Sequence, residues 1–373
     1  MNKINHTEGF FNKVLPTGHR IPGRINSLRE EYQIMKRLEG VIGISQRVSF
    51  ETRNNLDYLQ SLYIKGRQID FYRSDPQQMI PLLIKLSDVV TRIHRKGVHH
   101  RDFKFDHVKV DGVRDVYLLD FDQAVIGDPD SKIDFFCFKN TTGKNKPDKP
   151  WIGLGYLIKN NLGFGLVMEE ALKILKIIWR MGARSKANAP DHNICYYSWD
   201  LFGHHFAGER DWLARWDPIY SRLGDKIRGS RILELGCNLG MFSSYCAIHG
   251  AKECIGVDSF PDIVDAASLF AQTISANKAT FLQMDLNDRL NYEQFGGVYD
   301  FIVILSVMYW LKNKQALFNF LARQKCVIYE GHEKASLGKG EIDGAPFLKL
   351  LGFKNIEIIC KSERNRLIYL ATR

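Results

Sequence analysis

The sequence predicts two domains of different fold class, an α+β domain followed by an α/β domain with a parallel sheet. Its 373 residues exceed the size at which a single hydrophobic core usually stops growing. Two motifs carry the prediction, HHRDFKFDHVKV at residues 99–110 and ILELGCNLG at residues 232–240. Between them, SKANAP at residues 185–190 is typical of a linker. We therefore expect one domain over residues 1–190 and a second over residues 191–373.

The composition is that of a globular protein with acidic partners. Hydrophobic residues make up 45% and charged residues 25%, and the net charge of +10 favours nucleic acid, anionic lipid or a phosphorylated substrate. No run of like charges or RNA-binding signature accompanies this charge, so nucleic acid is the weaker expectation. No apolar run approaches the ~20 residues that span a bilayer, and the N-terminus has no apolar signal core. The seven cysteines form no CxxC pair. We expect a cytoplasmic protein, with a peripheral position at the inner membrane as an open alternative.

The first half shows a strand, a helix, and then a long helix that leads into the first motif. FFNKVL at residues 10–15 reads as a strand with one lysine, Lys13, and REEYQIMKRL places Glu31 on a helical pattern. Apolar residues recur at helical spacing over residues 76–96. After this helix come the first motif, a strand, a turn, a second strand and the tripeptide DFD at residues 120–122.

In this order the motifs resemble the protein-kinase-like fold, especially the small bacterial kinases that act on lipopolysaccharide or other glycans. The resemblance implies that Asp102 orients the acceptor hydroxyl and that Lys104 touches the transferring phosphate. It also implies that Lys13 and Glu31 form the pair that grips the nucleotide phosphates. Asp120 would hold magnesium, so ATP and Mg²⁺ are expected ligands.

Two departures leave the activity of this half open. His107 stands where a metal-binding asparagine is usual, and either its imidazole or the neighbouring Asp106 would have to substitute. Only twelve residues precede Lys13, fewer than two strands and a glycine-rich loop require. The residues are therefore compatible with a working kinase and with a pseudokinase that only binds.

The connection between the halves holds a glycine-containing stretch and a basic helix. Residues 153–165 contain four glycines and are expected to form a loop. Residues 166–187 are amphipathic and basic, which suits the closing core helix of a lobe better than a membrane-surface helix.

Residues 196–220 are dense in aromatic residues, histidine and arginine. Two interpretations remain open for this stretch. Its tryptophans either pack in a core, or the segment forms a flap over a bound cofactor, with Arg210 or Arg215 facing an anion. His204 is a third candidate for holding such an anion.

The second half begins with a strand, a glycine turn and a helix at residues 231–249. The turn permits close approach of a ligand to backbone amides, but its spacing is not GxGxxG. An acid, Glu234, stands two residues before Gly236, and Gly240 follows four residues later. This pattern resembles the class I S-adenosylmethionine-dependent methyltransferases, which have a Rossmann-like α/β fold. There the turn, here also containing Cys237 and Asn238, cradles the amino-acid end of the cofactor.

The later strands continue this resemblance. ECIGVD ends at Asp258, placed for the ribose hydroxyls, and ATFLQMD ends at Asp285, placed near the adenine amino group. A fourth, fully buried strand is expected over residues 300–309. Ser306 and Tyr309 lie toward its end, where the methyl-transfer site would open.

A fifth strand at residues 326–330 precedes the one candidate general base, His332, which is equally compatible with a solvated loop residue. A closing helix and strand pair complete the fold. A dehydrogenase is the nearest structural rival, and both the glycine spacing and this C-terminal hairpin disfavour it.

The pairing of the two halves resembles the bifunctional kinase/methyltransferases that terminate O-antigen polysaccharides, although in those enzymes the methyltransferase comes first. The resemblance implies phosphorylation of a sugar followed by methylation of that phosphate. It also implies a glycan acceptor and a glycosyltransferase partner of envelope biosynthesis. The alternative is a methyltransferase with a pseudokinase binding lobe that acts on RNA or another acceptor, since ELGCNLG also resembles methyltransferases that cap a terminal RNA phosphate.

Overall fold

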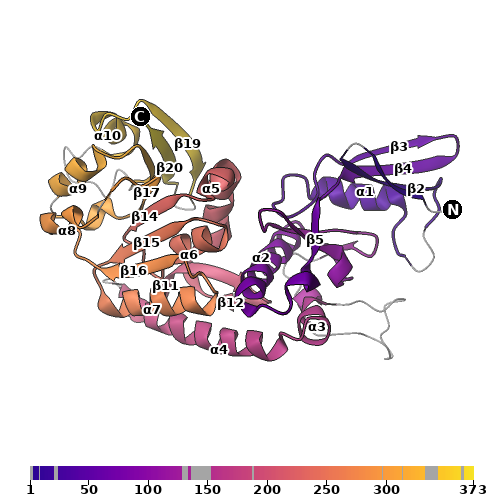
Figure 1. The fold of residues 1–373 in the computed structure, drawn as a ribbon, viewed down its shortest axis with the longest axis horizontal. Helices are drawn as coiled ribbons and strands as arrows, with labels where there is room; N and C mark the ends of the chain where they lie inside the picture. Colours follow the sequence, from indigo (N-terminus) through magenta and orange to yellow (C-terminus); the bar gives the residue numbers. More distant parts are fainter. Residues whose placement is uncertain are drawn as a thin grey trace. The chain divides into compact units, whose positions relative to one another are not determined.

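The computed structural model describes residues 3–7, 9–20, 24–127, 133–135, 153–186, 189–295, 297–312, 314–331, 343–362 and 365–373. The chain forms two compact units, Met1–Glu170 with Asp200–His205, and Ala171–Trp199 with Phe206–Arg373 (Figure 1). The division falls inside a helix, earlier than the boundary expected at residue 190, and the chain returns once to the first unit.

A four-stranded antiparallel sheet opens the first unit, in the order β1-β2-β4-β3. Its strands are β1 (Lys3–Thr7), β2 (Phe10–Pro16), β3 (Ser49–Arg53) and β4 (Leu56–Leu62). Helix α1 (Leu28–Arg37) starts with a capping box, in which Ser27 Oγ accepts from the Glu30 amide and the Glu30 carboxylate accepts from the Ser27 amide. This start fixes Glu31 in the first turn, where its side chain is buried. The strand and the helix expected around Lys13 and Glu31 are both confirmed.

The long helix of the first unit is α2 (Pro76–Arg95), capped by the Asp75 side chain, as expected for residues 76–96. Two short elements precede it, β5 (Gly66–Gln68) and η1 (Ile69–Tyr72). Short elements also follow it: β6 (Val98–His99), η2 (Phe105–His107), β7 (Val108–Asp111), β8 (Val116–Leu118), β9 (Val125–Ile126) and η3 (Ile133–Phe135). Strands β5, β7 and β8 form one sheet, and β6 pairs with β9. The HRD and DFD motifs therefore lie in the two loops that these small sheets hold together.

The connection differs from the expectation in three places. Residues 153–165 are not a loop, because they contain α3 (Leu154–Tyr156) and the π-helical η4 (Leu157–Asn161). Buried leucines stabilise these helical turns in spite of the neighbouring glycines. Helix α4 (Gly165–Gly182) ends before residue 187, because β10 (Arg184–Lys186) follows it. The expected linker contributes to β10 and to β11 (Ala189–Leu201), where Cys195, Tyr197, Trp199 and Leu201 alternate toward the core.

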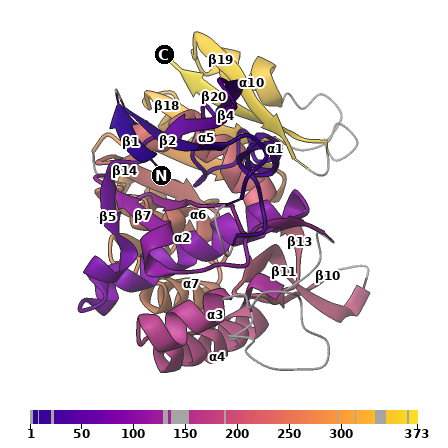
Figure 2. The same ribbon diagram turned by 90° about the vertical axis from the view of Figure 1, so that its right-hand side faces the viewer.

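Strand β11 is also the partner of two short strands that follow it. Strand β12 (His204–Phe206) pairs with β11. Strand β13 (Gly208–Asp211) pairs with β11 in parallel, and Figure 2 shows these two strands side by side. Strand β13 leads directly into α5 (Trp212–Ile227), which Asp211 caps.

The second unit contains a seven-stranded sheet in the order β16-β15-β14-β17-β18-β20-β19. Its strands are β14 (Arg231–Leu235), β15 (Glu253–Asp258), β16 (Ala279–Gln283), β17 (Phe301–Leu305), β18 (Cys326–Glu330), β19 (Asn355–Lys361) and β20 (Leu367–Thr372). The five strands β14 to β18 are parallel, and β20 is antiparallel to both of its neighbours. This arrangement confirms the expected Rossmann-like sheet with a closing C-terminal strand pair. It differs from an all-parallel dinucleotide fold in its last two strands.

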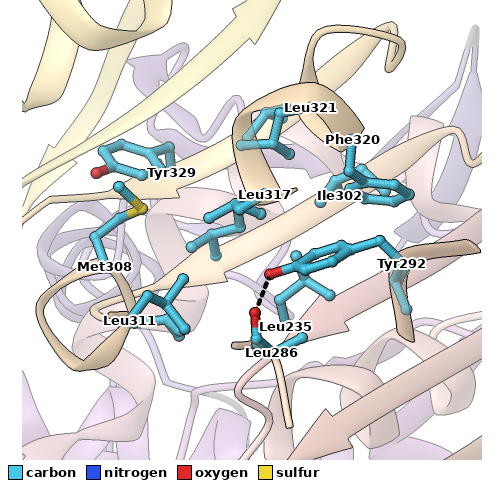
Figure 3. Packing of buried hydrophobic residues seen from close by; sticks show 14 of the residues in the cluster. Leu235, Leu286, Tyr292, Ile302, Met308, Leu311, Leu317, Phe320, Leu321 and Tyr329 are labelled. Atoms are coloured by element: carbon cyan, nitrogen blue, oxygen red, sulfur yellow. Dashed lines mark hydrogen bonds between the residues drawn. The ribbon is translucent and has the colours of Figure 1, made fainter. Parts of the chain in front are cut away.

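Helices cover both faces of this sheet (Figure 1). Helices α8 (Arg289–Glu293), α9 (Lys314–Leu321) and α10 (Gly344–Leu350) share one apolar core with the strands, drawn in Figure 3, where Tyr292 Oη donates to the Leu286 carbonyl at 2.9 Å. On the other face, α5 packs with α6 (Met241–Ile248) and α7 (Pro261–Thr273) lies beside α6. Trp212 and Trp216 stack with ring centroids 5.6 Å apart, and both contact Tyr245 of α6. The aromatic stretch at residues 196–220 is thus core packing, which disfavours the flap interpretation.

Two further observations bear on the chain's setting. None of the helices in the described part of the chain is long and apolar enough to cross a membrane. Six cysteines in that part are free thiols, and five of them are buried.

Candidate functional site

The first unit contains a cavity of about 430 Å³ between its antiparallel sheet and the loops of the HRD and DFD motifs. Apolar side chains such as Val14, Leu59 and Ile64 form its walls, and charged side chains gather at one end. Pockets of this size and mixture hold small organic ligands. Leu62 and Tyr63 also line it.

Lys13, Glu31 and Asp120 meet at the charged end of this cavity. Lys13 Nζ lies 2.8 Å from Glu31 Oε1 and 2.6 Å from Asp120 Oδ1. Burial alone would lower the pKa of Lys13, but the two carboxylates raise it above its usual range. Burial would raise the pKa of Asp120, yet Lys13 and then His107 hold it well below its usual range. The lysine is therefore a cation and Asp120 an anion at neutral pH.

The backbone at Asp120 is in the left-handed region, with φ of +64°. This conformation is costly for a residue other than glycine, and such residues concentrate at functional sites. It belongs to the turn that presents the Asp120 carboxylate to the cavity.

Asp102 and Lys104 lie together in the HRD loop, with Lys104 Nζ 2.7 Å from Asp102 Oδ2. His107 Nδ1 is 2.9 Å from the backbone carbonyl of Asp102, and its Nε2 is 3.3 Å from Asp120 Oδ2. Because a carbonyl oxygen only accepts, Nδ1 carries a proton, and Nε2 faces the Asp120 carboxylate.

These two atoms fit a divalent cation between them, with the carboxylate as the stronger ligand for magnesium. Asp106 also lines the cavity, with Oδ1 3.9 Å from His107 Nε2, so it is available as a further oxygen ligand.

A residue that the sequence reasoning missed, Asp134, fixes the HRD loop. Its carboxylate is buried and accepts from the amides of His100 (2.6 Å) and Arg101 (2.9 Å), and from His94 Nε2 (2.9 Å). Asp134, His94 and His99 lie close enough to hold a metal ion. Because Asp134 already accepts from three donors, its role is to hold the loop. The only sequence signal was an acid between two apolar residues, Ile133 and Phe135.

In the second unit, the turn after β14 has three residues with positive φ: Gly236, Asn238 and Gly240. A Cβ at Gly236 would lie 2.5 Å from Val307 Cγ2, and one at Gly240 would lie 2.2 Å from Phe281 Cε1. The turn therefore needs glycine at both positions, for conformation and for space. Its contact with Val307 also shows that it adjoins the end of β17.

Asp258 ends β15, as expected, and its Oδ2 accepts from the Asn238 amide of the turn at 3.0 Å. Asp285 is exposed after β16 and accepts from the Asn287 amide at 2.9 Å. The Cys237 side chain is buried, its amide donates to the Val257 carbonyl and its carbonyl accepts from the Gly240 amide, so its predicted contact with the cofactor stays a prediction.

Glu234 has a structural bond that the sequence did not reveal. It is buried, and its Oε2 accepts from the amide and the hydroxyl of Ser243 in α6, at 3.0 and 2.7 Å. Burial raises its pKa to about 8. Glu234 thus ties α6 to β14, and its predicted contact with a cofactor stays a prediction.

A buried polar cluster lies at the ends of β17 and β18. Ser306, with φ of +62°, donates to Glu330 Oε2 at 2.6 Å, and Arg215 Nη2 lies 2.9 Å from the same oxygen. Arg366, which the sequence reasoning also missed, donates from Nη1 to Ser306 Oγ at 3.3 Å. Because Val307 touches Gly236, this cluster adjoins the turn. Tyr309 is half exposed beside it.

The other predicted anion ligands are placed differently from the expectation. Arg210 and Arg215 are almost fully buried, and both lie over the ring of Tyr196, so neither is on an open flap. His204 is exposed and belongs to the first unit. His332 lies outside the described residues.

Comparison with known proteins decides the chemistry of the second unit. Residues 206–325 match the model of a family described as a methyltransferase domain. The second unit contains a methyltransferase domain. Its cofactor is S-adenosylmethionine, and the turn at residues 236–240 lies at the carboxyl end of β14, where this fold class binds ligands.

A segment of the chain is similar to one curated protein, the 23S rRNA (uracil(1939)-C(5))-methyltransferase RlmD of Shewanella woodyi. The two are 29% identical over 126 residues, which is 32% of this chain and 26% of RlmD. The chain thus spans about a quarter of that relative.

The solved structures that overlap this chain in part include WbdD and EvdMO1. The bifunctional kinase-methyltransferase WbdD is 21% identical with a TM-score of 0.35, covering 44% of this chain and 40% of WbdD. EvdMO1 is 19% identical with a TM-score of 0.38, covering 47% of this chain and 43% of EvdMO1. TM-scores this low support no argument about this chain. The fold of the methyltransferase domain is shown instead by the order of its own strands.

Proposed function

We propose that the chain is a bifunctional enzyme that phosphorylates a saccharide hydroxyl with ATP and then methylates the new phosphate. The observation that carries the first step is the Lys13–Glu31–Asp120 cluster, which shares one cavity with the HRD loop of Asp102. The second step rests on the methyltransferase domain in the same chain.

In the first step, Asp102 accepts the proton of the acceptor hydroxyl, whose oxygen forms a bond to the γ-phosphorus. The bond from that phosphorus to the β–γ bridging oxygen breaks, and ADP leaves with the electron pair. Lys13, held by Glu31, contacts the nucleotide phosphates, and Lys104 stands beside Asp102 at the transferring group. Asp120 and His107 would hold magnesium, which neutralises charge on the phosphates.

In the second step, a phosphate oxygen attacks the methyl carbon, and the carbon–sulfur bond breaks to leave neutral S-adenosylhomocysteine. A phosphate monoester has a second pKa near ~6, so at neutral pH it is an anion that needs no general base. Arg366, just before β20, donates to Ser306 Oγ beside the cofactor turn, and its guanidinium is the cation proposed to face such an anion. Glu330 is occupied by Arg215 and Ser306 and serves to hold them in place.

The proposed acceptor is a glycan of an envelope-building pathway, with a glycosyltransferase as partner and a peripheral position at the inner membrane. The net charge of +10 supports an anionic substrate or surface. A glycan phosphate is an anionic substrate of this kind.

A second candidate is a methyltransferase that acts on RNA, with a first unit that only binds. The partial similarity to an rRNA methyltransferase favours it. The two candidates separate in a thermal-shift measurement with ATP and magnesium, and in purification with and without nuclease. Stabilisation by the nucleotide supports the kinase, whereas nucleic acid that co-purifies and no response to ATP support the alternative.

The kinase step is tested by calorimetry with ATP at fixed magnesium concentration. We expect the parent to bind ATP and Asp120→Asn to lose the magnesium dependence of that binding, because the neutral amide is a poor magnesium ligand. Glu39→Gln, an exposed change in the same unit outside the cavity, is the matched control. If Asp120→Asn binds and turns over ATP as the parent does, the proposed kinase site is wrong.

A further inference from the structure

A third cation, Arg24, reaches the charged end of the cavity from the segment between β2 and α1. Its Nη1 lies 2.9 Å from Asp122 Oδ1 and 3.3 Å from Asp102 Oδ2, and its Nη2 lies 3.7 Å from Asp120 Oδ2. One guanidinium thus contacts the carboxylate expected to orient the acceptor, the one expected to hold magnesium, and the second acid of DFD. Arg24 also lines the cavity itself, with Lys13 and Asp120.

The segment that carries Arg24 is fixed to the DFD loop two residues further on. The Asn26 amide donates to the Asp122 carbonyl at 2.9 Å, and Asn26 Nδ2 donates to the carbonyls of Phe121 and Ala124, each at 2.9 Å. With three hydrogen bonds at Asn26, the backbone next to Arg24 is held against the site. Arg20, in the same segment, is exposed and pairs with the half-exposed Glu30 at the surface.

The charges around the cavity explain what Arg24 does there. Lys13 already faces Glu31 and Asp120, and Lys104 faces Asp102. When a divalent cation takes over Asp120, the guanidinium keeps Asp122 and still has donors directed into the space between Asp102 and Asp120. In a phosphoryl transfer the terminal phosphate crosses that space. A planar guanidinium with five N–H donors is suited to hold phosphate oxygens in a fixed direction.

We propose that Arg24 binds the terminal phosphate of ATP, as a phosphate-binding residue supplied by the segment ahead of α1. In the free chain the same guanidinium neutralises Asp102 and Asp122. This inference rests on the proposed kinase activity and adds to it the residue that distinguishes a triphosphate from shorter nucleotides.

The test is calorimetry of the full chain with ATP, ADP and AMP at fixed magnesium concentration, for the parent, Arg24→Ala, Arg24→Lys and Arg20→Ala. We expect Arg24→Ala to weaken ATP binding by about tenfold or more, the range of a hydrogen bond to a charged group, and to leave AMP binding unchanged. The ATP affinity of Arg24→Lys should lie between those of the parent and Arg24→Ala, because lysine keeps the positive charge but lacks the paired N–H donors of the guanidinium. Arg20→Ala, in the same segment outside the cavity, should bind all three nucleotides as the parent does.

Three results would overturn the inference, and they are distinguishable. If the parent binds ATP and both Arg24 variants bind it equally well, Arg24 is no phosphate ligand, although the kinase proposal stands. If Arg24→Ala binds ATP more tightly, Arg24 is an inhibitory contact that competes with the nucleotide. If the parent binds none of the three nucleotides, the proposed kinase activity fails and this inference fails with it. Arg24→Lys keeps the test valid should Arg24→Ala fail to fold.

Discussion

Asp258 shows how one side chain serves both the fold and a ligand at the end of a strand. Its Oδ2 accepts from the Asn238 amide at 3.0 Å and its Oδ1 from the Phe260 amide at 3.4 Å, which fixes the carboxylate beside the turn, where we expect it to accept from the ribose hydroxyls of S-adenosylmethionine. We expect Asp258→Ala to weaken cofactor binding by ~1–3 kcal/mol, the cost of hydrogen bonds left unmade. Calorimetry with S-adenosylmethionine measures this loss. Asp265→Ala, an exposed acid on α7, is the control, and an unchanged affinity in Asp258→Ala would contradict the cofactor assignment.

Glu234 gives the second unit a predictable dependence on pH. Burial raises its pKa to about 8, above the ordinary value of 4.5, so the folded chain keeps a proton that the unfolded chain releases between these two pH values. Its contribution to stability therefore falls as pH rises through that window and becomes level above it. Glu234→Gln keeps an acceptor for Ser243 and should remove the fall.

Urea unfolding followed by tryptophan fluorescence tests this prediction, because all five tryptophans in the described residues lie in the second unit. Glu293→Gln, an exposed change at the end of α8, is the control. A parent whose stability does not decline between pH 5 and pH 8, relative to Glu234→Gln, would show that Glu234 is not a buried, protonated acid.

At this scale the sequence predicted the residues that carry motifs and missed those that act across long separations. Lys13 and Glu31 were predicted to pair, and the structure places Lys13 Nζ 2.8 Å from Glu31 Oε1 and also 2.6 Å from Asp120 Oδ1, the predicted magnesium ligand. Arg24 was missed because its partners Asp102 and Asp122 lie 78 and 98 residues away in the chain. No local pattern marks such a contact.

At the scale of single elements, the turn between β14 and α6 is the most constrained. Gly240 has φ of +65°, and a Cβ there would lie 2.2 Å from the Phe281 ring. We expect Gly240→Ala to destabilise the second unit by the ~1–2 kcal/mol of left-handed backbone plus ~1–3 kcal/mol of overpacking, and to abolish cofactor binding.

Gly229→Ala separates these two effects. Gly229 has φ of +72° and no atom within 4 Å of its added Cβ, so its substitution should cost the backbone energy alone. Urea unfolding of both variants gives the difference. Equal losses in the two variants would contradict the close packing of the turn on Phe281.

Helices and strands with a regular spacing of apolar residues were predictable from the sequence. Helical segments that contain several glycines were not. Helix α2 and the parallel strands have long apolar patterns, and each lies within a few residues of its expected range. Residues 154–161 form helix in spite of their glycines, because Leu154, Leu157 and Ile158 are buried on one side. Local glycine content cannot reveal such burial.

At the scale of the whole molecule, the motifs predicted the fold of the second unit but not the division between the units. Residues 200–205 return to the first unit, where the Phe202 amide donates to Ser87 Oγ at 2.8 Å. A linker-like composition at residues 185–190 could not predict this return, because it depends on contacts between distant segments.

The central claim is that the two units act in sequence through one phosphate, and one assay tests it most directly. The parent and Asp102→Ala are incubated with labelled S-adenosylmethionine, with or without ATP and magnesium, and with octyl glycosides or the matching sugar phosphates. The account predicts that the parent labels a glycoside only when ATP is present, that Asp102→Ala labels none, and that both label the sugar phosphate. If label reaches the glycoside undiminished without ATP and without Asp102, the two units are not coupled through a phosphate and the account is contradicted.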